Sequence, residues 1–151
     1  MTAVKKAIAA KDYRSELELD APRERVFDAL ATLAGVRGWW TTLVSGNAEL
    51  EGVLRLRFRG MDEHIDLRVS RLQRPSELEW MVIEHSSLEE WDGTRIQFRL
   101  SARGENACTL SFHHAGLSPR LMCYEDCEAG WDRFLDSLAR LVERGKGKPF
   151  A

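Results

Sequence analysis

The sequence has little of what several classes of protein require. Three cysteines among 151 residues are too few, and odd in number, for a disulfide framework, so we expect reduced thiols in a cytoplasmic protein. No apolar run approaches the length of a membrane span, and the apolar patch in MTAVKKAIAAKDY is too short for a signal sequence. A net charge of −2 argues against a dedicated nucleic-acid binder, which is usually basic. Neither a membrane nor a nucleic acid is therefore an expected partner.

The motifs of common enzymes are missing as well. The sequence has no Gly-rich phosphate loop, no nucleotide-binding fingerprint, and no nucleophile spaced from a base and an orienting carboxylate. We therefore predict no catalytic residue and no cofactor.

What is present is ordinary for a globular protein, with 44% hydrophobic and 30% charged residues. The chain is long enough to bury a real core in one domain. Residues 1–12 are rich in Ala and Lys without a periodic apolar face, which predicts a tail. Residues 13–151 then form the single predicted domain.

Alternating apolar residues predict strands through most of the chain, beginning with RSELELD and resuming at Leu43. Arginines and carboxylates take the alternate positions, so the other face of the sheet is predicted to be solvated and cross-paired. The predicted inward residues are Leu17, Leu19, Leu54, Leu56, Phe58, Ile65, Leu67, Val69, Leu78, Trp80, Val82, Ile96, Phe98, Leu100, Cys108, Leu110, Phe112 and His114. The polar group Glu84, His85, Glu89, Glu90 and Asp92 is interpreted as ordinary turn polarity.

Helical periodicity appears in three places. PRERVFDALA, with Val26, Phe27 and Leu30 on one face, predicts a short helix, and a second one runs into Gly38-Trp39-Trp40. A long helix is predicted from Pro119 to Arg144, with Ser118-Pro119 as its start and Gly145 as its stop. Its apolar face comprises Cys127, Trp131, Phe134, Leu135, Leu138, Leu141 and Val142.

One helix cannot cover so many strands unless the sheet curls around it. The predicted fold class is therefore α+β, a helix-grip arrangement in which a curved antiparallel sheet of about six or seven strands wraps the long C-terminal helix. Two short helices follow the first strand.

Three segments carry a resemblance to a known family. They are LDAPRERVFDAL closing on Trp39-Trp40, the strand Gly93–Phe98, and the end YEDCEAGWDRFLDSLARLVERGKGKPF with its GW..FL.SL pattern and final GKG.PF. From about Arg14 to Phe150 the chain resembles the START/Bet v 1-like (SRPBCC) superfamily, and within it the branch related to the C-terminal domain of the Hsp90 ATPase activator. The resemblance implies a helix-grip fold with a cavity between the long helix and the sheet.

The resemblance leaves three functions open. The first, which we favour, is binding of a small hydrophobic or amphipathic ligand in that cavity. The second is an enzyme of cyclase, aromatase or hydrolase type, and the third is an interaction module like an Hsp90 co-chaperone. Stimulation of Hsp90 is not expected, because the activator's separate N-terminal domain is missing from this sequence. A homodimer is left open.

The predicted cavity lining consists of residues from the inward faces and from the segment before Leu43. Trp39 and Trp40 are adjacent, so we expect one to pack inward and the other to cap the cavity mouth. The full set is Trp39, Trp40, Trp80, Phe98, Leu110, Phe112, His114, Cys127 and Trp131, with His114 as the polar contact.

One grouping resembles a metal site. His113 and His114 precede Cys123 and Cys127, which share a helix face at i, i+4, and zinc accepts such ligands. The C-x₃-C spacing is common by chance and cysteine is among the most buried residue types, so we prefer to interpret the pair as small core thiols. We predict unpaired, metal-free cysteines.

Overall fold

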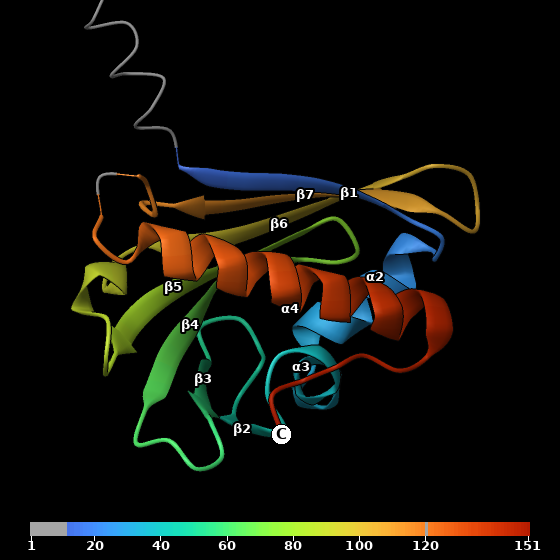
Figure 1. Cartoon of the computed structure of the whole chain (residues 1–151). Helices are drawn as coiled ribbons and strands as arrows, with labels where there is room; N and C mark the ends of the chain where they lie inside the picture. Colours follow the sequence, from blue (N-terminus) through green and yellow to red (C-terminus); the bar gives the residue numbers. More distant parts are fainter. Residues whose placement is uncertain (1–11, 120) are drawn as a thin grey trace, which may run out of the picture.

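The structure of the protein is a computed structural model that describes residues 12–119 and 121–151 (Figure 1). The predicted tail, residues 1–12, lies outside the described residues except for Asp12. The elements are β1 (Tyr13–Leu19), α2 (Arg23–Ala31), α3 (Leu33–Trp39), β2 (Leu43–Gly46), β3 (Val53–Arg57), β4 (His64–Gln73), β5 (Glu77–His85), the 3-10 turn η1 (Glu89–Trp91), β6 (Arg95–Ala102), β7 (Cys108–Ala115) and α4 (Tyr124–Arg144).

The strands form one antiparallel sheet in the order β1-β7-β6-β5-β4-β3-β2. The sheet curves around α4, which lies across its inner face, and α2 and α3 sit beside the C-terminal half of α4 (Figure 1). The predicted α+β helix-grip fold is confirmed, with seven strands and two short helices after the first of them.

The period-2 pattern places the inward residues as predicted. All of them are buried except Leu17, which is half-buried on the edge strand β1. An edge strand has a neighbouring strand on one side only, so its side chains are less covered, which explains the exception. The concave face is therefore a continuous apolar surface onto which α4 packs.

The outer face of the sheet is polar and cross-paired, also as predicted. Arg55 donates to both carboxylate oxygens of Asp66 at 2.8 Å, and Arg95 donates to Glu79 at 3.0 Å. Such pairs are half-exposed, so each contributes at most about 1 kcal/mol to stability. They keep the outer face polar and solvated.

The start of α4 corrects the prediction from Pro119. The helix begins at Tyr124, because the chain first makes two turns: the Leu121 N–H donates to the Ser118 carbonyl, and the Tyr124 N–H donates to the Leu121 carbonyl. Its first turn carries Glu125 and Asp126, which the positive end of the helix dipole favours.

The predicted stop at Gly145 is confirmed by a left-handed residue with φ of 84°.

After α4 the chain folds back along the molecule. A Cβ on Gly147 would lie 2.5 Å from the Gly38 carbonyl oxygen, so only glycine permits this close approach. The Lys148 N–H donates to Ser137 Oγ at 2.7 Å, and Phe150 bridges to Thr41. The final GKG.PF segment is thereby fixed beside β2, with the Phe150 ring against Phe58.

Candidate functional site

Aromatic rings fill most of the space between α4 and the sheet. Trp40 lies at the centre, with ring centroids 5.0 Å from Trp131 and 5.9 Å from Trp80. Trp39 stacks on Trp40 at 5.5 Å and points deeper, where its Nε1–H donates to the Ala29 carbonyl. Both tryptophans are buried, and of the two only Trp40 reaches open space.

That open space is a groove of about 270 Å³ beside the N-terminal half of α4, which we call the α4 groove. Its walls come from α4, from β4 and β5 with the loops that follow β3 and β5, and from the C-terminal segment. Most are apolar, and polar groups stand mainly toward the rim. The lining residues are Trp40, Phe58, Met61, Glu63, Ile65, His85, Leu88, Trp91, Asp126, Cys127, Gly130, Trp131, Arg133, Phe134 and Phe150.

Gly130, in the N-terminal half of α4, leaves the helix without a side chain on this side. A Cβ built there would meet no atom within 4 Å, so no close packing requires glycine. Glycine inside a helix costs roughly 0.5–1 kcal/mol relative to alanine. The sequence therefore gives up helix stability at the position that leaves the groove open.

His85 reaches the groove because of a β-bulge. Strand β5 pairs Glu84 with Asp66 and Val82 with Leu67, so Ile83 has no opposite residue on β4. The extra residue reverses the alternation: Glu84 turns to the outer face, and His85 turns inward opposite Ile65. The sequence prediction missed His85 for this reason. A signal was present, since apolar Ile83 falls on the outward side of a strict alternation and Glu84 on the inward side.

The hydrogen bonds of His85 fix where its proton lies. Nδ1 accepts from the backbone N–H groups of Ser87 at 3.2 Å and Leu88 at 3.0 Å, so the neutral ring carries its proton on Nε2. Within residues 12–119 and 121–151, Nε2 has no partner, and the only enclosed unpaired side-chain polar atom is Thr42 Oγ1. The Nε2–H group is therefore accessible. Burial lowers the pKa of His85, opposed in part by Glu63 and Asp92, so the ring is neutral near pH 7.

His114, the polar contact predicted from sequence, is placed differently. Nδ1 accepts from Trp131 Nε1–H at 3.0 Å, and Nε2 lies 2.8 Å from Thr94 Oγ1, whose own proton goes to the Trp91 carbonyl. Both nitrogens are thus used inside the protein. Burial lowers the pKa of His114 to about 3, with a further contribution from His113, so the ring is neutral.

The cysteines are free and buried. Cys127 Sγ accepts from Trp91 Nε1–H at 3.2 Å. Burial raises the pKa of the Cys123 thiol to about 12, and contacts with Cys127 and Glu90 act in the same direction. Since zinc binds thiolates, neither the Cys123 thiol nor the fully hydrogen-bonded His114 is a ready ligand.

A different metal-like group lies on the outer face, where ligand atoms of His64, Asp66 and Glu84 come within 4.8 Å of one another. Asp66 is already held at both oxygens by Arg55, whose guanidinium keeps the pKa of that carboxyl below its usual range. His64 also pairs with Glu84 at 2.9 Å. These contacts make the group a set of cross-strand pairs.

The nine residues predicted to line a cavity separate into two sets. Trp40, Cys127 and Trp131 line the α4 groove. The others are buried between α4 and the sheet and do not line the α4 groove; they are Trp39, Trp80, Phe98, Leu110, Phe112 and His114. The groove residues that lie on the loops and on the C-terminal segment were not predicted, because no periodic pattern places them.

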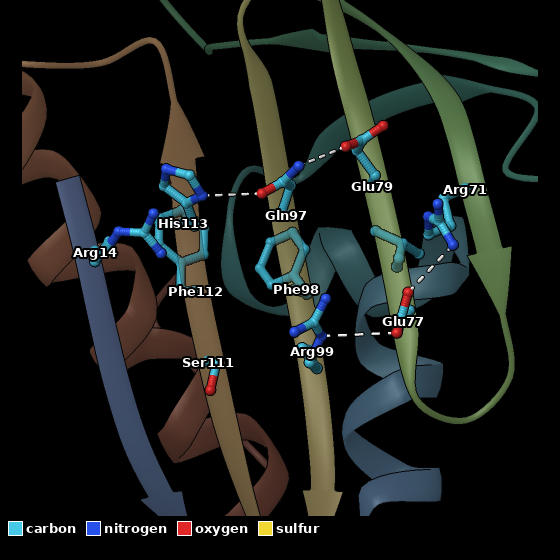
Figure 2. Close-up of a pocket in the computed structure, with 11 residues that line it drawn as sticks. Arg14, Arg71, Glu77, Glu79, Gln97, Phe98, Arg99, Ser111, Phe112 and His113 are labelled. Carbon is cyan, nitrogen blue, oxygen red and sulfur yellow. Dashed lines mark hydrogen bonds and ion pairs between the residues drawn. The ribbon is translucent and has the colours of Figure 1, made fainter. Parts of the chain in front are cut away.

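A second, larger hollow of about 470 Å³ lies on the outer face of the sheet, and we call it the outer-face hollow (Figure 2). Most of its polar side chains are paired with one another: His113 contacts Gln97, Gln97 donates to Glu79, and Glu77 binds both Arg71 and Arg99 (Figure 2). Because these groups satisfy one another, the outer-face hollow shows fewer features of a ligand site than the α4 groove.

A comparison with family models identifies the relatives of this chain. The model described as "Activator of Hsp90 ATPase homolog 1-like protein" matches residues 20–143. The chain belongs to this family. The match includes α2, α3 and nearly all of α4, so the Hsp90 activator-like family covers the elements that form most of the α4 groove.

Solved structures agree with this membership. The solution structure of the Aha1 dimer from Colwellia psychrerythraea is 29% identical with a TM-score of 0.77, covering 90% of this chain and 98% of that one. CalU16 from Micromonospora echinospora, at 21% identity and a TM-score of 0.70, covers 89% of this chain and 75% of its own. SSP2350 from Staphylococcus saprophyticus, at 17% and 0.71, covers 93% and 99%. The last two show the fold that this Hsp90 activator-like chain shares with them.

A search of the curated proteins found no match. Among the described residues, no helix combines the length and the apolarity needed to cross a membrane.

Proposed function

We propose that the protein binds a small hydrophobic or amphipathic molecule in the α4 groove. The observation that carries the proposal is Gly130, which faces open space inside the N-terminal half of a long helix and lines an apolar groove. A ligand that occupies the space of the missing side chain would explain why this position keeps glycine in spite of the lost helix stability. A groove with mainly apolar walls and few polar groups is typical of sites for small molecules.

The size of the groove limits the ligand. Its volume of about 270 Å³ lies just below the roughly 300 Å³ at which pockets for drug-sized molecules begin. A compact molecule of one or two rings fits this space. Aromatic walls from Trp40, Trp91, Trp131 and Phe134 favour flat or aromatic ligands, which stack on such rings.

The test is a block of the groove from within α4. The neutral two-ring dye 6-propionyl-2-(dimethylamino)naphthalene, whose emission strengthens and shifts to shorter wavelength in apolar surroundings, should give that response with the wild-type protein. Gly130→Leu should abolish the response, because its side chain occupies the groove. Ala129→Leu, which adds an equally large side chain to an exposed position of α4, should leave the response intact. Circular dichroism would establish that both variants are folded. An equal response from all three proteins would refute the proposal.

A second candidate, interaction with Hsp90, is supported by the family match over residues 20–143. It predicts that the purified chain alters the ATPase rate of Hsp90, and that the Gly130→Leu variant alters this rate to the same extent as the wild type. An unchanged ATPase rate would leave ligand binding as the proposed function.

The proposal includes the compartment and the assembly. Three buried free thiols support a reducing cytoplasm. The dimer formed by the Colwellia relative supports a homodimer, which sedimentation equilibrium would test.

A further inference from the structure

The two ring nitrogens of His85 have different tasks. Nδ1 is committed to the loop that follows β5, where it accepts from the N–H groups of Ser87 and Leu88. Nε2–H is left as an accessible donor on a ring that lines the α4 groove. Because a committed Nδ1 cannot carry the proton, the ring presents a donor and never an acceptor while it is neutral.

The position of this donor is rigid. The β-bulge at Ile83 turns His85 inward, and the ring packs edge-on against Trp91 with centroids 5.0 Å apart. A donor held by the backbone on one side and by an indole on the other loses little entropy when a ligand binds it. Such a group can fix the orientation of a ligand as well as hold it.

The charges around the donor favour an uncharged ligand. The carboxylates of Glu63 and Asp126 line the groove, and Asp92 lies behind His85, where it accepts the His85 backbone N–H. The cation of the lining, Arg133, lies over the Phe134 ring, 5.4 Å from its centroid. A ligand carboxylate at His85 would therefore face negative charges, whereas a carbonyl oxygen would accept the hydrogen bond without that repulsion.

We propose that His85 Nε2–H is the specificity-determining donor of the α4 groove, and that the ligand is an uncharged, largely apolar molecule with a carbonyl oxygen. This inference rests on the proposed function, since it names the ligand class of the same groove. His85 is a binding residue in it, and no chemical step is involved.

Three probes of one shape test the inference. 2-Acetylnaphthalene carries the carbonyl, 2-isopropylnaphthalene replaces its oxygen with a methyl group, and 2-naphthoate replaces the ketone with a carboxylate. Dissociation constants would be measured by calorimetry for the wild type, His85→Asn and His85→Gln. In His85→Asn, the amide oxygen can accept from the Ser87 and Leu88 N–H groups while the Nε2 donor is lost. In His85→Gln, the amide NH₂ reaches the position of Nε2, so the donor is retained.

We expect His85→Asn to lower the preference for the ketone over the hydrocarbon by about tenfold, the effect of one buried hydrogen bond. His85→Gln should retain most of the preference, and 2-naphthoate should bind the wild type more weakly than the ketone. A measurement on the wild type alone keeps the test independent of the variants: the carbonyl stretch of bound 2-acetylnaphthalene should move to lower wavenumber than in an apolar solvent.

The failures can be told apart. Equal preferences in the wild type and His85→Asn, an unshifted carbonyl band, or tighter binding of 2-naphthoate would each overturn the role of His85. If Gly130→Leu still blocked the probes, the proposed function would stand. If none of the probes bound, or if Gly130→Leu had no effect on them, both the inference and the groove as a ligand site would be refuted.

Discussion

His85 and His114 contact the same tryptophan, but only His114 has protein partners at both ring nitrogens. The Trp91 ring meets His85 at 5.0 Å and His114 at 4.7 Å, both edge-on. Around His114 the protein is closed: the side chain has no exposed surface, and both nitrogens have protein partners. Around His85 it is open, with one nitrogen committed and the other accessible at the groove.

The difference shows how one residue type serves two purposes in one fold. A buried imidazole with two protein partners holds the structure together, because any loss of a partner leaves a polar group unpaired. An imidazole with one free donor adds less to the core and can bind something else. The state of the second nitrogen, more than the burial of the ring, separates the two roles.

The largest predicted loss of stability comes from a substitution in the packed interior. Leu138 lies on the buried face of α4, so Leu138→Ala should lower the free energy of unfolding by about 2–5 kcal/mol, measured by urea denaturation. The control is Asp136→Ala on the exposed face of the same helix, where loss of the pair with Arg140 should cost less than about 0.5 kcal/mol. Equal losses would contradict the observed packing of α4.

Acid should act on the closed region through His114. The folded pKa is lowered to about 3, whereas the unfolded imidazole titrates near 6.5. Below pH 6.5 the unfolded chain binds a proton that the folded chain does not, so stability is full above pH 6.5 and falls as the pH drops toward 3. The loss should reach up to about 1.4 kcal/mol per pH unit.

Unfolding free energies of the wild type and of His114→Gln, measured between pH 7 and pH 4.5, would isolate this contribution. The wild type should show the steeper slope, because glutamine does not titrate. Parallel slopes would mean that the His114 ring is already protonated, or reached by water, in the folded protein.

The smallest effect should come from the open region and have the opposite sign. Gly130→Ala should raise the free energy of unfolding by about 0.5–1 kcal/mol, since its Cβ meets no atom and alanine favours the helix. Gly147→Ala is the contrasting variant, because its Cβ would lie 2.5 Å from a carbonyl oxygen and should destabilise the protein. Destabilisation by both would mean that the groove has no free volume at Gly130.

The packed interior could be predicted from the sequence, whereas the α4 groove could be predicted only in part, through Trp40, Cys127 and Trp131. Strict alternation in β6 and β7 was enough to place Phe98, Phe112 and His114 inside, because apolar burial and strand geometry impose the same period. The apolar stripe of α4 was likewise enough to predict Trp131 and Leu138. These patterns predict the packed interior, and that interior includes residues first assigned to a cavity lining.

The groove depends on departures from those patterns. One bulged residue, Ile83, decides which way His85 points, and bulges are set by the pairing of two strands rather than by either strand alone. The turns between Ser118 and Tyr124 move the start of α4, and a return of the chain after Gly145 brings in Phe150. The bulge and the returning C-terminal segment depend on contacts between separate segments of the chain, whereas the turns before α4 are closed by local hydrogen bonds that no apolar period reports.

All five tryptophans of the chain belong to one continuous cluster of rings that branches at Trp40. Trp39 adjoins Trp40, Trp40 adjoins both Trp80 and Trp131, and Trp131 adjoins Trp91, with centroids 5.0–6.0 Å apart. At such separations excitation energy passes between indoles within the lifetime of the excited state. Light absorbed anywhere in this cluster can therefore be emitted or lost at the rings that line the groove. A molecule that quenches Trp91 should lower the fluorescence of all five tryptophans, so binding in the groove could be followed by intrinsic fluorescence without an added label.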